Sequence, residues 1–395
     1  MTYTQRIAHL KPEGAYQVLA KSQALEKAGR EIIHFEIGQP DFDTFENIRD
    51  AGIQAISTGQ TRYTPPAGML ALKEAIAEAA GKERGLSFLP EQIVIGPGAK
   101  PLLFFPAMAL IEPGDEVIYP NPGFPTYEAM IGVMGGVPVP VPLKEEKNFS
   151  FDLEAFDRLI NERTRMIILN SPGNPTGGVI PTADLEHIAE AAKRYDAWVL
   201  SDEIYARIVY DGLEIPSIAG LPGMLERTII VDGFSKTYAM TGWRLGYRIM
   251  PAGLAKKIDL LLTHSVGCSA HFTQVAGLEA VRGPQDRVRE VVEIYQKRRD
   301  FIVAGLNKIP GVVCQKPQGA FYVFPNVKAF GKTSSELADM LLQEAGVAVL
   351  PGSSFGKFGE GYLRLSYATS MEIIERGLGK MREALESMVF VKPSE

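Results

Sequence analysis

The sequence has few cysteines, no long apolar run and no excess of positive charge. The two cysteines, Cys268 and Cys314, are too few for a disulfide framework or a cysteine metal cluster, so we expect reduced thiols, a cytoplasmic protein and no bound metal. The longest apolar stretch, residues 102–111, contains Pro106 and is too short to cross a bilayer. The 41 basic and 47 acidic residues leave a net charge of −6, which offers no surface for nucleic acid or an acidic membrane. Residues 1–6 lack the apolar core of a signal peptide.

What the sequence does have is an alternation of short apolar runs with amphipathic helical patterns. Its 395 residues, 46% of them hydrophobic, are enough for a large core. Strands that alternate with helices predict an α/β domain with a mostly parallel sheet. Several runs end in polar or turn-forming residues, as expected where a site lies beyond the carboxyl ends of the strands. The expected strands are residues 92–96, 116–119, 137–141, 166–170, 198–201, 228–231 and 245–249, and the helices between them include 70–83, 100–111 and 182–195.

The pattern changes after about residue 254. A long charged helix over residues 286–306 precedes an alternating strand at 318–324, and further elements are expected at 334–344, 347–350, 362–366 and 370–388. A helix at 16–29 and a strand at 32–37 fit the same unit. We therefore predict a large domain over residues 46–285 and a smaller α+β domain formed by residues 1–45 and 286–395.

The most informative motif is Ser235-Lys236, which follows an apolar run and precedes Arg244 by a few residues. A lysine at the exposed end of a buried strand can form a Schiff base with an aldehyde cofactor. The neighbouring hydroxyl and guanidinium suit a cofactor phosphate. A surface lysine is the plainer explanation of this motif when it is considered alone.

Two glycine-rich turns strengthen the interpretation. The segment 96–100 lies between a strand and an apolar helix, where small residues let backbone N–H groups approach an anion. The segment 170–177 contains Asn174 between two prolines, and an amide held in this way can donate to a phenolate-like ring oxygen. Each segment can also be an ordinary turn.

Two charged residues at the ends of apolar runs add to the pattern. Asp202 can cap a helix, or it can face a protonated ring nitrogen and keep the ring an electron sink, with Tyr205 on the same face. Arg364 lies in the middle of an apolar strand, where a buried guanidinium needs an anionic partner. That partner is either a protein carboxylate or a bidentate substrate carboxylate. Together these features match the demands of pyridoxal phosphate chemistry on an amino acid.

In this combination and order, the chain resembles the class I/II aminotransferases of the aspartate aminotransferase superfamily. These are fold type I pyridoxal-phosphate-dependent enzymes, and the resemblance runs from about residue 7 to residue 385. It includes the segments 38–42, 63–68, 170–177, 201–205, 235–236 with 242–244, and 364–366. It implies an α/β fold with a mostly parallel seven-stranded sheet in the large domain, and pyridoxal 5'-phosphate as cofactor.

The resemblance also implies catalytic roles. Lys236 is similar to the Schiff-base lysine that then moves a proton between the α-carbon and the cofactor. Asp202 resembles the partner of the ring nitrogen. Asn174 and Tyr205 resemble the pair that binds the ring hydroxyl oxygen, and Phe124 stands where the family stacks an aromatic ring on the cofactor.

Further implied roles concern the cofactor phosphate, the substrate and a second subunit. Tyr63 resembles a tyrosine that reaches the phosphate of the neighbouring subunit, which implies a homodimer with active sites at the interface. Arg364 resembles the clamp for the substrate α-carboxylate, assisted by Asn174 and the backbone of Gly38. The residues similar to the phosphate site are Gly98, Ala99, Lys100, Ser235 and Arg244.

The expected activity is transfer of the α-amino group of an L-amino acid, for example aspartate or another small amino acid, to a 2-oxo acid such as 2-oxoglutarate or pyruvate. Because the amino group leaves one substrate before it reaches the next, ping-pong kinetics are expected. Residues 121–127 and 263–271 depart from the aspartate-type pattern, so the donor stays open. The alternatives are a β-elimination (C–S) lyase on the same fold and, more remotely, the ligand-binding domain of a transcription regulator.

Overall fold

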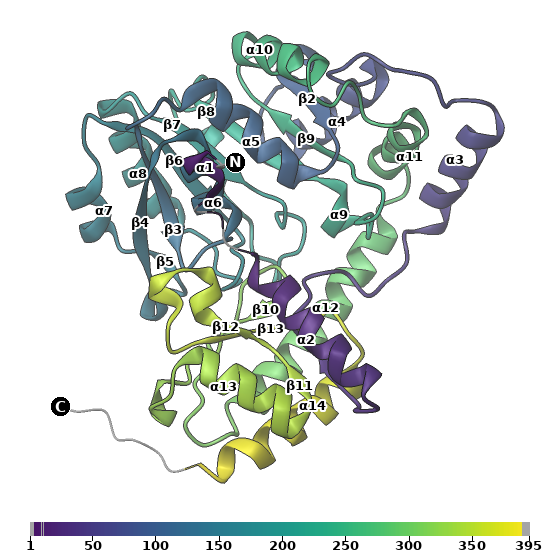
Figure 1. Ribbon diagram of the computed structural model, residues 1–395. Helices are drawn as coiled ribbons and strands as arrows, with labels where there is room; N and C mark the ends of the chain where they lie inside the picture. Colours follow the sequence, from purple (N-terminus) through teal and green to yellow (C-terminus); the bar gives the residue numbers. More distant parts are fainter. Residues whose placement is uncertain (1–3, 9, 11, 389–395) are drawn as a thin grey trace.

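A computed structural model describes residues 4–8, 10 and 12–388 of the chain. A large sheet with helices on both faces forms one part, and a smaller unit of helices and short strands packs below it (Figure 1). Within the described residues, no helix is both long and apolar enough to span a membrane.

The large sheet has eight strands in the order β2-β9-β8-β7-β6-β3-β4-β5. Neighbouring strands from β8 through β4 are parallel, whereas β9 is antiparallel to both of its neighbours and β5 is antiparallel to β4. All seven predicted strands are present. The sheet has eight strands and not seven, because the short β5 pairs with β4 at its edge. The strands are β2 (Ile93–Gly96), β3 (Glu116–Asn121), β4 (Val137–Lys144), β5 (Ser150–Phe151), β6 (Thr164–Asn170), β7 (Trp198–Asp202), β8 (Thr228–Gly233) and β9 (Gly246–Ile249).

Helices cover both faces of this sheet (Figure 1). The helices of this part are α3 (Glu46–Ser57), which packs on α11 (His271–Arg282), and α4 (Leu70–Arg84), α5 (Ala99–Leu110), α6 (Thr126–Met134), α7 (Leu153–Leu159), α8 (Thr182–Arg194), α9 (Phe234–Thr237) and α10 (Ala252–Thr263). Successive strand residues point to opposite faces. Ile168, Leu200 and Ile229 therefore pack in one apolar cluster with α5, α6 and α10. Ile167 and Val199 pack in another with α7 and α8. Burial on both faces explains why these strands read as continuous apolar runs.

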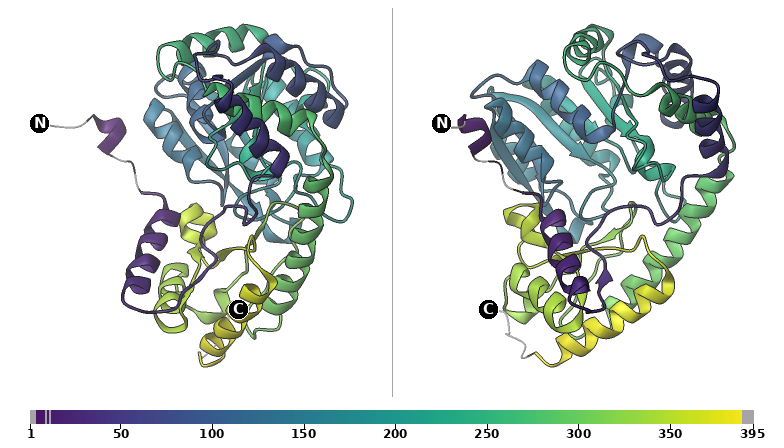
Figure 2. Two further views of the ribbon diagram at one scale, coloured as in Figure 1. Left: turned by 90° about the vertical axis from the view of Figure 1, so that its right-hand side faces the viewer. Right: turned by 45° about the vertical axis from the view of Figure 1, so that its right-hand side comes forward.

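The smaller unit joins the two ends of the chain. Its elements are α2 (Gly14–Lys27), β1 (Ile33–His34), α12 (Asp286–Leu306), β10 (Tyr322–Val323), α13 (Ser334–Met340), β11 (Val347–Ala348), β12 (Leu350–Pro351), β13 (Leu363–Ser366) and α14 (Met371–Glu386). The short α1 (Gln5–Ala8) lies instead against α6 of the large-sheet part (Figure 1). Strand β1 pairs in parallel with β11, and β13 pairs with both β10 and β12. Figure 2 shows the long α12 running from the sheet part down to α14.

The strands of the smaller unit are shorter than the sequence pattern predicts. The alternating run at 318–324 contributes only β10, and the run at 32–37 only β1. Pairing of β1 with β11 brings the N-terminal segment to the C-terminal part of the chain, as expected from the sequence. The domain boundaries at 45/46 and 285/286 stay a prediction, and residues 1–3, 9, 11 and 389–395 of that division lie outside the described residues.

Candidate active site

A cavity of about 610 Å³ lies where the carboxyl ends of the parallel strands meet. Strand β6 ends at Asn170, β7 ends at Asp202, and β8 leads directly into α9, which carries Lys236. Because parallel strands end at the same edge of a sheet, their terminal side chains converge there. The predicted site residues that line this cavity are Gly38, Ala99, Lys100, Phe124, Asn174, Asp202, Tyr205, Ser235, Lys236, Arg244 and Arg364.

Lys236 is the amine at the centre of this cavity. Its Nζ donates a 2.6 Å hydrogen bond to the backbone oxygen of Gly38. Burial, together with the positive charges of Arg364 and other nearby cations, lowers the pKa of Lys236 to about 8, while Asp202 opposes this shift. A fraction of this amine is therefore neutral near pH 7, which a nucleophile or a proton acceptor requires.

Asp202 is the buried carboxylate of the site, 6% exposed. Its Oδ2 accepts a 2.6 Å hydrogen bond from the hydroxyl of Tyr127, and its Oδ1 accepts from the backbone N–H of Ile204. Burial raises the pKa of Asp202 to about 6, although these two donors lower it. The carboxyl group is therefore mainly ionised at neutral pH and able to pair with a cationic nitrogen.

The hydroxyl and amide donors of the site come from three elements. The hydroxyl groups of Tyr205 and Tyr322 are 2.7 Å apart in a buried hydrogen bond. The backbone N–H of Asn174 donates to Oδ1 of Asn170, which holds the turn after β6. The Oδ1 atom of Asn174 is buried without a hydrogen-bond partner among the described residues. A polar atom of this kind at a cavity wall is suited to a ligand.

The N-terminus of α5 and Arg244 form the cationic end of the cavity. Gly98 precedes the helix with φ +93°, and a Cβ there would collide with the guanidinium of Arg244. Glycine is therefore required both by the backbone conformation and by this contact. The first N–H groups of α5, at Ala99 and Lys100, have no partner within the helix, so this end of the cavity favours an anion.

Two further charged groups face the cavity. Arg364 is buried, its guanidinium donates to the backbone oxygen of Glu36, and its Nε has no partner among the described residues. The ammonium of Lys100 pairs with a carboxylate oxygen of Glu13 at 2.6 Å and lies 4.9 Å from the ring centre of Phe124. The Lys100 ammonium is thus held at the cavity wall by Glu13.

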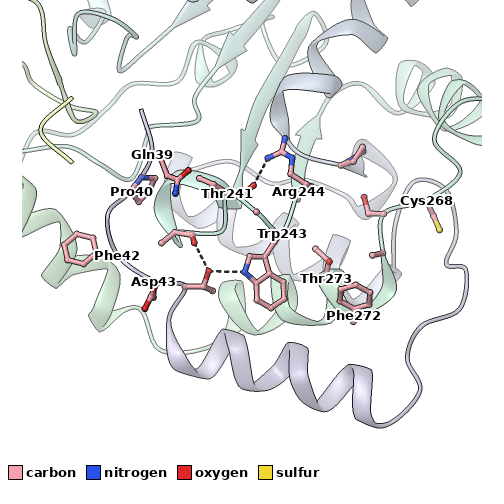
Figure 3. A pocket seen from close by; sticks show the side chains of 16 residues that line it. Gln39, Pro40, Phe42, Asp43, Thr241, Trp243, Arg244, Cys268, Phe272 and Thr273 are labelled. Carbon is pink, nitrogen blue, oxygen red and sulfur yellow. Dashed lines mark hydrogen bonds between the residues drawn. The ribbon is translucent and has the colours of Figure 1, made fainter. Parts of the chain in front are cut away.

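A second pocket of about 690 Å³ shares Gln39, Thr241, Gly242 and Arg244 with the first. Figure 3 shows Arg244 and Trp243 among its lining residues, with the Arg244 guanidinium donating to the backbone oxygen of Thr241. The predicted residue Tyr63 lines neither pocket and is 96% exposed. In this single chain, Tyr63 is therefore not brought to the site.

Several cavity residues were not singled out from the sequence. Tyr127 lies three residues after Phe124, and this helical spacing could have indicated that both side chains face the same cavity. Tyr322 looks like a core residue of an alternating strand, and no sequence pattern links Glu13 to Lys100. The other lining residues without a prediction include Tyr16, Gln39, Asn170 and Thr241.

The comparison with known families agrees with this geometry. The family model described as aminotransferase class I and II matches residues 30–381. The chain belongs to this family.

Relatives of known name share nearly the whole chain. A probable aspartate/prephenate aminotransferase of Aquifex aeolicus is 42% identical over 97% of this chain and 98% of its own length. An aromatic-amino-acid aminotransferase of Thermococcus litoralis is 38% identical over 99% of this chain and 100% of its own. The crystal structure of the aspartate aminotransferase from Rhizobium meliloti superposes with a TM-score of 0.94 at 36% identity, over 98% of this chain and 100% of that one. This family member therefore has the fold type I architecture and is an aminotransferase.

Proposed function

We propose that this aminotransferase uses pyridoxal 5'-phosphate to move the α-amino group of an L-amino acid to a 2-oxo acid. The observation that carries the proposal is the convergence of Lys236, Asp202 and Arg364 on one cavity. An amine, a carboxylate and a guanidinium are what the cofactor aldehyde, the cofactor ring nitrogen and a substrate α-carboxylate require.

The described residues fit this cofactor. The unpaired Oδ1 of Asn174 and the unpaired Nε of Arg364 are buried polar atoms at the cavity. The N-terminus of α5 with Ser235 and Arg244 would hold the phosphate, and Phe124 would lie against the ring. When bound, pyridoxal phosphate supplies an electron sink that weakens the bond between the substrate α-carbon and its hydrogen.

Each residue then has a task. Lys236 would hold the aldehyde carbon of the cofactor through Nζ, and its free amine would carry the proton that leaves the substrate α-carbon. Asp202 would keep the ring nitrogen protonated, and the Tyr205 hydroxyl with the side-chain N–H group of Asn174 would donate to the ring oxygen. Arg364, assisted by the Gly38 backbone, orients the substrate carboxylate.

The donor is proposed from the relatives. Their names specify aspartate, prephenate and aromatic amino acids, so aspartate and an aromatic amino acid are the donors to test first. Those named relatives are aminotransferases, which favours transfer over the C–S lyase alternative.

We further propose a cytoplasmic homodimer with two domains divided at residues 45/46 and 285/286. The exposed apolar side chains of Ile53, Ile56 and Tyr63 support a covered surface near α3. The pocket of Figure 3 reaches Arg244, where Tyr63 of a second copy would approach the phosphate. Light scattering of the purified protein tests this, and a monomer at micromolar concentration would contradict it.

The activity is tested by mixing the cofactor-loaded protein with one amino acid and no oxo acid. We expect one equivalent of oxo acid per site, together with loss of the visible absorption of the aldehyde form. Continuous accumulation of pyruvate and ammonia instead would show a lyase.

A further inference from the structure

Arg248 is a fully buried arginine in the middle of β9. Its exposed fraction is 0%, and Nε, Nη1 and Nη2 have no hydrogen-bond partner among the described residues. A guanidinium stays protonated in proteins, so this position holds a fixed positive charge inside an apolar region. Such a charge is unfavourable unless a negative group compensates it.

Strand register shows where that negative group stands. Arg248 of β9 pairs with Val231 of β8, and Val231 pairs with Asp202 of β7. Residues paired across neighbouring strands point to the same face, so Arg248 and Asp202 share one row of the sheet, two strands apart. Two strand spacings bring their backbones to about 10 Å, within reach of a long arginine side chain.

The surroundings of this row are apolar. Val231 lies in the apolar cluster formed with α5 and α6, which also contains Tyr127. Val94, the other row neighbour of Arg248, belongs to the same cluster. Water does not screen charges here, so a cation and an anion on this row act on each other strongly.

Several groups around the Asp202 carboxyl act on it, and the buried hydroxyl of Tyr205 is also close enough to feel its charge. Tyr127 of α6 and the N–H of Ile204 donate to it, Asp232 of β8 repels its charge, and Lys236 and Arg248 attract it. Burial lowers the pKa of Arg248, and the negative charge of Asp202 opposes that effect. Each charge therefore offsets part of the cost of burying the other.

We infer that Arg248 is a positioning residue that acts through Asp202: its fixed charge keeps that carboxyl ionised in the apolar interior. The inference rests on the proposed function, in which Asp202 pairs with the cofactor ring nitrogen. Arg248 would then set how firmly the carboxylate and the ring nitrogen together hold their proton, without touching either the cofactor or the substrate.

Physical chemistry gives the direction of the effect. Burial raises the pKa of Asp202 to about 6, and the charge of Arg248 is among the causes that lower it. Burial and the negative charge of Asp232 both raise the pKa of Asp202, and without the charge of Arg248 they are less opposed. The carboxyl of Asp202 should then retain its proton to a higher pH.

The test follows the Asp202 carboxyl directly by ¹³C NMR. Full-length protein, with and without pyridoxal phosphate, is labelled at aspartate carboxyl carbons, and the Asp202 signal is assigned by its loss in Asp202→Asn. In Arg248→Met we expect the titration midpoint without cofactor to rise by about one pH unit, a tenfold change in proton affinity, and a rise in the same direction with cofactor.

Two further variants keep the result decisive. Val94→Ala removes packing from the same row without changing charge, so the titration midpoint of Asp202 should equal that of the wild type. Arg248→Gln removes the charge but keeps a polar group. If Arg248→Met does not fold, the same rise in the Asp202 midpoint is expected in Arg248→Gln. Unchanged midpoints in the folded charge-removing variants would overturn the inference. Because no turnover is needed, that failure is distinct from failure of amino-group transfer.

Discussion

The side-chain amine of Lys236 donates to the backbone oxygen of Gly38 at 2.6 Å, although the two residues are 198 positions apart in the chain. A Cβ at Gly38 would collide with the Tyr322 hydroxyl. The N-terminal segment thus contacts the reactive amine through its backbone and packs so closely against Tyr322 that only a glycine fits. Gly38 therefore links the N-terminal segment to Lys236 at the strand edge and to Tyr322 in the C-terminal part of the chain.

Replacement of this glycine should therefore impair the site. We expect Gly38→Ala to lower kcat/KM by about tenfold or more, because the added methyl displaces either Tyr322 or the backbone oxygen that holds Lys236. Steady-state kinetics measure this. Gly253→Ala is the matched control, since a Cβ there meets nothing within 4 Å, and equal losses in both variants would contradict the explanation.

The pKa of Lys236 predicts how the apoprotein captures its cofactor. Only the neutral amine reacts with an aldehyde, so a pKa of about 8 means that the capture rate rises with pH and levels off above pH 8. Between pH 6 and pH 8 the neutral fraction grows by about 50-fold. Stopped-flow absorption measures the rate.

The control for this profile is a lysine outside the cavity. Lys236→Ala should abolish stable capture, whereas Lys256→Ala, on the exposed side of α10, should behave as the wild type. A rate that keeps rising tenfold per pH unit to pH 10 would indicate an ordinary lysine and contradict the effect of burial.

Tyr322 is predicted to support Tyr205. Tyr322→Phe removes the hydroxyl 2.7 Å from that of Tyr205 but keeps the ring that lies 4.6 Å from the Arg364 guanidinium carbon. We expect a loss of about 1 kcal/mol in the free energy of unfolding and a lower kcat, with KM for the amino acid nearly unchanged. Denaturant unfolding and steady-state kinetics check this, and a selective rise in KM would instead assign the hydroxyl to substrate binding.

The Lys100–Glu13 pair should influence which donors are accepted. A side-chain carboxylate near Lys100 would have to compete with Glu13, which already holds the ammonium at 2.6 Å. We expect Glu13→Gln to raise the kcat/KM ratio of aspartate to phenylalanine by several-fold, because it frees the cation. An unchanged ratio would show that the donor side chain does not meet this pair.

Much of the fold was predictable because its strands are buried on both faces and separated by turn residues. The edge strand β5, Ser150–Phe151, was not, since two residues carry no periodicity. The meeting of Asp202 and Lys236 followed from the rule that parallel strands end at one edge.

Contacts between distant segments could not be read from the sequence. Glu13 and Lys100 are 87 positions apart, and nothing local in either segment signals the pair. Arg248 lies in a run that reads as an ordinary apolar strand, and only the strand register places it in the same row as Asp202, two strands away. The role of Tyr63 stays a prediction because it concerns a second copy of the chain.

The central claim is that the amino group is handed from one acid to another and not released. The most direct test is an isotope-transfer experiment. The cofactor-loaded protein is given ¹⁵N-labelled aspartate and unlabelled 2-oxoglutarate, and a parallel sample receives ¹⁵N-labelled phenylalanine in place of aspartate. We predict that the label appears in the newly formed amino acid, one equivalent for each oxo acid produced from the donor. Recovery of the label as free ammonium, with no labelled product amino acid, would contradict the account.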